Sequence, residues 1–196
     1  MRRIFLALLL VPFVAACEEG GTQAIFGTVP SGPATGSVRI RVVDDPAGAA
    51  VVSNPGSRPT VTLIFSADLV GATTFSVTSN QTAIQVPVDS VSSTVVTIAN
   101  DTVRAGAFST VRLQLVSATL AIPGVLQTID LLGGTLDPVI TRPVAITVGA
   151  NTITTLVIDI NSGSWLRPVS NPLPGEPTFT FDGTSAFLDA ISITAQ

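Results

Sequence analysis

Apolar and polar residues alternate strictly along several stretches of this chain, and this alternation limits the possible folds more than any other feature. Residues 37–43 read Ser-Val-Arg-Ile-Arg-Val-Val, and residues 110–115 read Thr-Val-Arg-Leu-Gln-Leu. Successive side chains of a β-strand point to opposite faces, so each stretch presents one apolar face and one polar face as a strand. The best helical spacing, at 186–191, is too short to stand alone as a helix.

Roughly nine to eleven short strands separated by turn residues are predicted on this basis. They fall at 37–43, 61–65, 75–77, 84–88, 95–98, 110–115, 125–131, 144–148, 152–160, 179–181 and 187–193. Turns are expected at Asp44-Asp45-Pro46 and at Asn100-Asp101, because acids, asparagine and proline favour turns. Pro87 lacks a backbone donor, which marks 84–88 as an edge strand. The expected fold class is an all-β, antiparallel β-sandwich, with a partly closed β-barrel as the alternative.

The N-terminal segment carries the features of an export signal. Arg2 and Arg3 precede the apolar run 4–11, and Val14-Ala15-Ala16-Cys17 follows with the single cysteine of the chain. The run is too short to cross a bilayer as a permanent helix, which takes about 20 residues. The segment resembles the signal peptides of bacterial lipoproteins. This resemblance implies cleavage before Cys17 and acylation of that residue, whereas an ordinary secretory signal cleaved near Ala16 is the alternative.

A signal of this kind divides the chain into three parts. Residues 1–16 are the expected signal peptide, 17–36 a flexible tether rich in glycine and proline, and 37–196 the sandwich domain. Several acyl chains hold a protein on a membrane stably, whereas a single chain holds it marginally. The expected location is the bacterial cell envelope, with the lipid on Cys17 as the membrane contact. Glu18 stands where the lipoprotein rule for retention in the inner membrane usually has aspartate, which favours the outer membrane.

The composition excludes several kinds of chemistry. Histidine, tyrosine and lysine are absent. Ser-His-Asp and Cys-His catalysis are therefore excluded, as are zinc sites built from histidine or cysteine. Charged residues make up 11% of the chain and the formal net charge is −4, which does not suit a nucleic-acid partner. The sequence leads us to expect no enzymatic activity and no cofactor.

Three segments together carry a resemblance to a known family. They are Ser37 to Pro46, the segment from Arg104 to Leu115 (Arg-Ala-Gly-Ala-Phe-Ser-Thr-Val-Arg-Leu-Gln-Leu), and the strand from Leu156 to Ile160. Over about residues 37 to 165 the chain resembles a group of bacterial lipoproteins that share a domain of unknown function. The resemblance implies an immunoglobulin-like or transthyretin-like sandwich. It brings no activity with it.

Two pairs of residues are candidates for a site. Asp159 and Asn161 begin an Asp-x-Asn-x-Gly pattern, which is typical of the first half of a calcium-binding loop, although Ser170 stands where the bidentate acid is expected. The alternative to a calcium site is that these residues form only the end of a strand and the turn that follows it. Trp165 with Arg167 would suit a sugar ligand through stacking and a guanidinium fork. The alternative is that Trp165 fills one end of the core.

The sequence therefore favours a non-catalytic, lipid-anchored envelope protein that acts as a structural or interaction module in adhesion or assembly, with an envelope protein or a glycan as partner. The first alternative is a carbohydrate-binding module that uses Trp165. The second is a hydrolase that uses two carboxylates, drawn from Asp130, Asp137, Asp159 and Asp182.

Overall fold

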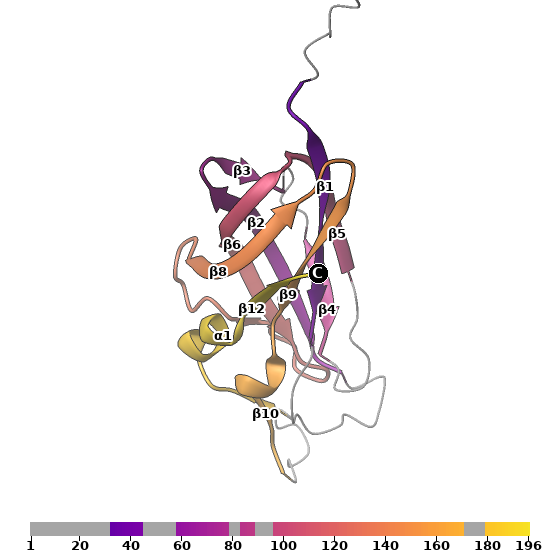
Figure 1. Ribbon diagram of the computed structural model, residues 1–196. Helices are drawn as coiled ribbons and strands as arrows, with labels where there is room; N and C mark the ends of the chain where they lie inside the picture. The colour runs from indigo at the N-terminus through magenta and orange to yellow at the C-terminus, as the bar shows by residue number, and fades with distance from the viewer. Residues whose placement is uncertain (1–31, 45–57, 79–82, 89–95, 171–178) are drawn as a thin grey trace, which may run out of the picture. The chain divides into compact units, whose positions relative to one another are not determined.

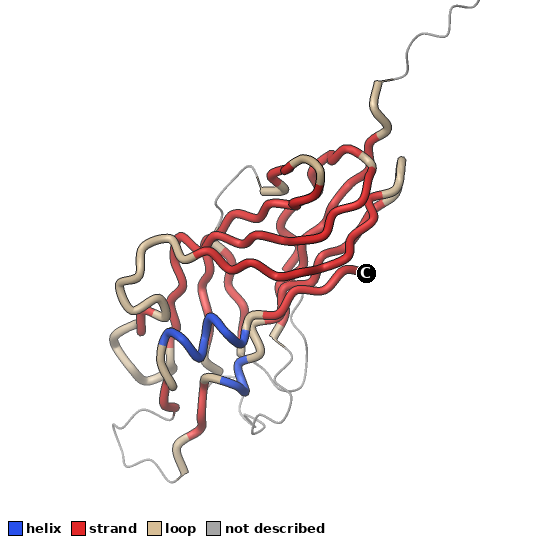
Figure 2. The backbone as a smooth tube through the Cα atoms, turned by 60° about the vertical axis from the view of Figure 1, so that its left-hand side comes forward, coloured by secondary structure: helices blue, strands red, loops and turns tan. Residues whose placement is uncertain are grey.

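A computed structural model of the chain describes residues 32–44, 58–78, 83–88, 96–170 and 179–196. The predicted signal, Cys17 and most of the predicted tether lie outside these residues, and so does Asp45. Strands make up most of the described backbone, and its helical segments gather toward one end (Figure 2). Within the described part no helix is long and apolar enough to cross a membrane.

The strands form two main sheets and one small ribbon (Figure 1). The first sheet has the order β12 (Ser192–Ala195), β9 (Ile153–Asp159), β1 (Thr35–Val43), β5 (Val96–Arg104). The second has the order β3 (Thr74–Ser76), β2 (Thr60–Gly71), β6 (Gly106–Ala121), β7 (Ile129–Asp130). In addition, β4 (Ile84–Pro87) pairs with β2, and β8 (Val139–Val148) pairs with β6. The ribbon pairs β10 (Leu166–Pro168) with β11 (Phe179–Phe181). Neither main sheet closes on itself, which confirms the all-β sandwich in place of the partly closed barrel.

The alternation of the sequence determines which faces meet. The inward residues of both sheets belong to one apolar cluster, and its central members are at most 2% exposed. These are Val38, Ile40, Val42, Val61, Leu63, Phe65, Leu69, Val111, Leu113, Leu115, Leu156 and Ile158. Asp68 and Arg112 occupy outward positions between them and form an ion pair of 3.0 Å as direct cross-strand partners. Burial of the apolar face thus fixes the register, because a slip by one residue would expose every core side chain.

One strand pair in the first sheet is parallel. β9 lies alongside β1 with Ile40 opposite Leu156, whereas the other pairs of that sheet are antiparallel. The chain reaches β9 from β8 of the other sheet through a turn at 149–152, and Ser37 donates its amide to the Thr152 carbonyl at 2.8 Å. A Cβ at Gly36 would lie 2.2 Å from the Gly149 carbonyl oxygen. Only glycine therefore allows the two segments to approach this closely.

Two of the sequence predictions in the middle of the chain were wrong. The turn predicted at Asn100-Asp101 is instead part of β5, which continues to Arg104. Arg39 pairs with Asn100 while Arg41 pairs with Thr97, so β5 accommodates one extra residue as a β-bulge. Of the strand predicted at 125–131, the structure forms only β7. Pro123 and Gly124 form a turn before it, and Leu126 is fully exposed.

The C-terminal prediction of a strand at 187–193 was also wrong in part. Residues Thr184–Ala190 form the helix α1, and only the following residues form β12. A seven-residue helix is unstable alone, so its stability comes from tertiary contacts. The Phe187 side chain is completely buried.

Arg142 of β8 holds the C-terminal end of α1. Its Nε donates to the Ile191 carbonyl at 3.0 Å, and its Nη2 donates to the carbonyls of Leu188 and Asp189 at 3.1 and 3.4 Å. These oxygens have no partner within the helix and lie at the negative end of its dipole. Arg142 therefore links β8 of the second sheet to residues 188–191, which lead into β12 at the edge of the first sheet.

We predict that Arg142→Lys lowers the free energy of unfolding by about 2 kcal/mol, because an ammonium group cannot reproduce the fork of bonds to several carbonyls. The control is Arg112→Lys, which alters an exposed ion pair and should change stability by no more than about 0.5 kcal/mol. Urea denaturation followed by circular dichroism measures both. Equal losses in the two variants would show that the contacts of Arg142 do not stabilise the helix.

Candidate functional site

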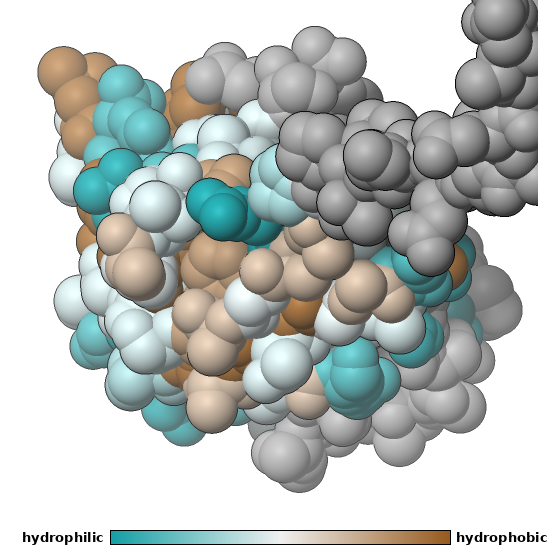
Figure 3. Space-filling view, turned by 45° about the horizontal axis from the view of Figure 1, so that its top comes forward, coloured by the Kyte–Doolittle hydropathy of each residue, from teal (hydrophilic) through white to brown (hydrophobic). Residues whose placement is uncertain are grey.

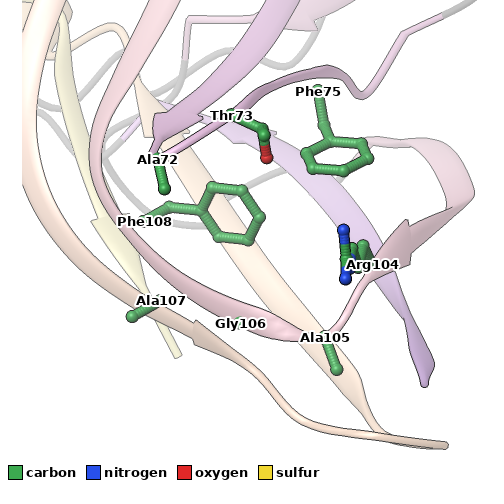
Figure 4. Close-up of a pocket in the computed structure, with 8 residues that line it drawn as sticks. All are labelled: Ala72, Thr73, Phe75, Arg104, Ala105, Gly106, Ala107 and Phe108. Carbon is green, nitrogen blue, oxygen red and sulfur yellow. The ribbon is translucent and has the colours of Figure 1, made fainter. Parts of the chain in front are cut away.

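Two turns at the end of the domain where β1 begins enclose a pocket of about 220 Å³. The turn between β2 and β3 contributes Ala72 and Thr73, followed by Phe75 of β3. The rest of the lining consists of Arg104 at the end of β5, the connecting residue Ala105, and the first residues of β6, Gly106 to Phe108. We call this cavity the turn pocket (Figure 4). Figure 3 brings the same end of the domain forward and shows apolar surface exposed among weakly polar and hydrophilic residues.

Local features of β2 and β6 bring the two turns together. Gly71 pairs with Phe108 at the end of the β2–β6 ladder, and a Cβ at Gly71 would lie 2.8 Å from the Ala107 carbonyl oxygen. A side chain there would therefore force the turns apart. The Ala105 amide also donates to the Ala34 carbonyl at 2.8 Å, which attaches the β5–β6 connection to the start of β1.

A β-bulge in β6 directs the Phe108 ring into the pocket. Val70 pairs with Thr110 but Gly71 pairs with Phe108, so Ser109 is an extra residue on this strand. Without the bulge, Phe108 would share the outward face with Thr110 and Arg112. Instead Phe108 is only 6% exposed, while Ser109 is exposed. The bulge therefore places an aromatic ring at the end of the core.

Polar and aromatic groups converge inside the turn pocket. The rings of Phe75 and Phe108 meet edge to face, with centroids 5.9 Å apart. Figure 4 shows the Thr73 hydroxyl oxygen between these rings and the Arg104 guanidinium on the same side, close to Phe75. Among the described residues that line the pocket, none is acidic. The arrangement offers one cation, one hydroxyl and an apolar wall to a ligand.

Gly106 leaves open space in this wall. It stands two residues before Phe108 in β6 and pairs with the buried Val148 of β8, so its missing side chain belongs to the inward face. A Cβ built there meets no atom within 4 Å. Gly106 is exposed, and a longer side chain at this position would extend into open space beside the pocket.

The structure places Trp165 in the core. Its side chain is completely buried, and its Nε1 donates to the Ile160 carbonyl at 2.8 Å. Phe181 and Phe187 pack edge to face against its ring, with centroids at 6.0 and 5.2 Å. No ring face is left for a sugar, so the carbohydrate-binding alternative loses the residue on which it rested.

Arg167 lies apart from any ligand-binding group identified in the sequence. It extends from β10 and forms an exposed ion pair with Asp182, which follows β11. Its partner in the sequence hypothesis, Trp165, points into the core instead. The two side chains therefore do not form a shared binding surface.

Asp159 and Asn161 form a turn at the end of β9. The Asp159 Oδ1 accepts the Asn161 amide at 2.9 Å, and Asn161 has a φ of 37°. This is the local hydrogen bond that aspartate makes in turns. Within the described part of the chain, no group of three or more acidic, cysteine or histidine residues is placed to hold a metal ion.

Other carboxylates have structural partners. Asp44 is 1% exposed and accepts both the Ser162 amide, at 2.8 Å, and the Ser162 hydroxyl, at 2.7 Å. Asp130 accepts the amides of Leu132 and Gly134, both at 2.9 Å. These acids therefore hold turns in place.

The sequence contained only a weak signal of the turn pocket. Arg104, Gly106 and Phe108 lie in one of the three segments that carry the family resemblance, and Phe75 lies in the predicted strand 75–77. Thr73 carried no pattern at all. No protein-family model, curated protein or solved structure matches this chain, so the function is argued from this geometry.

We predict that Ser162→Ala costs about 1 kcal/mol of stability and that Asp44→Ala costs about 3 kcal/mol. The first change removes one hydrogen bond, whereas the second leaves the buried Ser162 amide and hydroxyl without their acceptor. Asp68→Ala is the control on an outward face and should cost no more than about 1 kcal/mol. Chemical denaturation measures the three variants. A smaller loss for Asp44→Ala than for Ser162→Ala would contradict this role.

Proposed function

We propose that this protein is a lipid-anchored, non-catalytic binding module of a bacterial envelope, and that it holds its ligand in the turn pocket. The observation that carries the proposal is the convergence of Arg104, Thr73 and two phenylalanine rings in one cavity. Binding sites typically combine an apolar lining with a few polar groups that fix orientation.

The position of the pocket supports a role in binding. Its lining combines residues of the β2–β3 turn and the β5–β6 connection with the ends of β3, β5 and β6. Groups at strand ends and in turns suit a binding role because a rigid scaffold holds them in place. Here the scaffold is the β2–β6 ladder, which runs from Thr60 and Ala121 to Gly71 and Phe108. The ligand would meet groups that the fold has already placed.

The proposed anchor would join the domain at this same end. Thr35, the first residue of β1, is the strand partner of Arg104. A chain from Cys17 to Thr35 would have a root-mean-square span of about 20–25 Å if flexible. A ligand in the turn pocket would therefore be held on the side of the domain to which the tether attaches.

The acids support a non-catalytic role. Asp44, Asp130 and Asp182 each have a defined structural partner. The turn pocket itself is lined by a cation and a hydroxyl. Two carboxylates facing each other across a cleft, which glycoside hydrolysis requires, do not line it.

The anchor can be tested by changing one atom of Cys17. We predict that the natural protein sediments with membranes and that mass spectrometry finds acyl chains on Cys17. Cys17→Ser lacks the thiol that would carry the lipid, so it should appear in the soluble envelope fraction. Membrane association that survives in the serine variant, or an unmodified Cys17, would overturn the proposed anchoring.

The binding role can be tested by filling the pocket. Gly106→Ile adds a side chain on the inward face where a Cβ has space. Thr147→Ile adds the same side chain on the exposed outward face of β8 and serves as the control. Native mass spectrometry of protein taken directly from envelopes should show an added mass that Thr147→Ile retains and Gly106→Ile loses. If the three proteins carry the same masses, the turn pocket is not the binding site.

A further inference from the structure

We infer that the turn pocket recognises a carboxylate carried on a small apolar group. This inference rests on the proposed binding function and names the chemical class of the ligand. Two sources present such a group: a free small organic acid, and the C-terminal residue of a polypeptide with an apolar side chain. The chemistry is the same in both, because each joins one carboxylate to one apolar body.

The charge in the pocket selects an anion. Arg104 is the one cation among the described lining residues, and none of them is acidic. The two ion pairs that the structure shows between described residues belong to Arg112 and Arg167. The chain as a whole is acidic, with a formal net charge of −4. Arg104 is exposed beside the pocket, and its positive charge on an acidic protein attracts a negative group locally.

The geometry of the donors favours a carboxylate. A guanidinium presents parallel N–H donors in a plane, which match the two oxygens of a carboxylate. The Thr73 hydroxyl faces the same space and offers a further donor (Figure 4). One guanidinium and one hydroxyl suit a group with a single charge.

The wall of the pocket requires that the rest of the ligand be apolar. Phe108 is 6% exposed, and Phe75 packs against the core at its edge. Phe75 is only partly buried, so the apolar part of a ligand would contact this ring, with Phe108 packed behind it.

The volume limits the size of the apolar group. A cavity of about 220 Å³ corresponds to about seven water molecules at about 30 Å³ each. Pockets for drug-sized ligands hold about 300–1,000 Å³. The pocket therefore has room for one aromatic ring or one branched aliphatic chain.

The test uses four probes on the full-length protein with Cys17→Ser, which keeps it soluble. Phenylacetate and its neutral isostere phenylacetamide represent the free acid. The peptide Gly-Gly-Gly-Phe with a free carboxylate and the same peptide as its amide represent a polypeptide C-terminus. Amide chemical shifts in NMR spectra report binding at residues 72–75 and 104–108.

We predict saturable shifts with at least one carboxylate probe and at least tenfold weaker binding of its amide counterpart. The carboxylate probe that binds more tightly, phenylacetate or the peptide, shows whether the ligand is a free acid or a polypeptide C-terminus. Arg104→Gln should weaken binding at least tenfold, whereas the control Arg167→Gln, at an exposed arginine of the other end, should not alter it. Gly106→Ile should abolish binding, and Thr147→Ile should preserve it. Unchanged melting temperatures show that the variants are folded.

Three results would overturn the inference: equal binding of acid and amide, binding unaffected by Arg104→Gln, or no binding of any probe. The outcomes also separate this inference from the proposed function. Protein from envelopes could carry an added mass that Gly106→Ile loses, while none of the carboxylate probes binds. This result would support the binding function and contradict the carboxylate ligand. Carboxylate binding by a protein whose Cys17 is never acylated leaves the inference standing and removes the anchor.

Discussion

Burial of one apolar core between the inward faces of two open sheets is the constraint on which the rest of this structure depends. The long ladder between β2 and β6 forms the centre of one sheet, and β1 lies between β5 and β9 in the other. Because strand side chains alternate, this burial fixes the register of each strand and so the position of each turn. The turn pocket and the C-terminal helix lie where these strands end.

The two ends of the domain are finished in different ways. At one end Trp165, Phe181 and Phe187 fill the space between the sheets, and the buried Asp44 carboxylate fixes the short helical turn that leads to Trp165. At the other end Gly71, Gly106 and the bulge at Ser109 leave a cavity. At the filled end Trp165 and Phe187 are completely buried, whereas at the pocket Phe108 is buried and Phe75 is only partly buried.

The same contrast separates two groups of residues. Trp165 and Asp159, which are chemically distinctive in the sequence, make local or buried contacts at the filled end. The pocket is lined instead by Ala72, Thr73 and Phe75 and by the segment from Arg104 to Phe108. These two groups of lining residues are far apart in the chain, and only the fold places them side by side.

The sequence by itself determined the fold class and most strand positions, because a period of two leaves an apolar face that only a sheet can bury. It also identified Pro87 on an edge strand, which pairs on one side with β2 alone. Only the tertiary structure decided the bulges at Asn100 and Ser109, the helix at Thr184–Ala190, and the meeting of Thr73 with Arg104. Each of these depends on contacts between residues far apart in the chain: a partner strand creates the bulge, Arg142 and Trp165 support the helix, and two separate turns form the pocket.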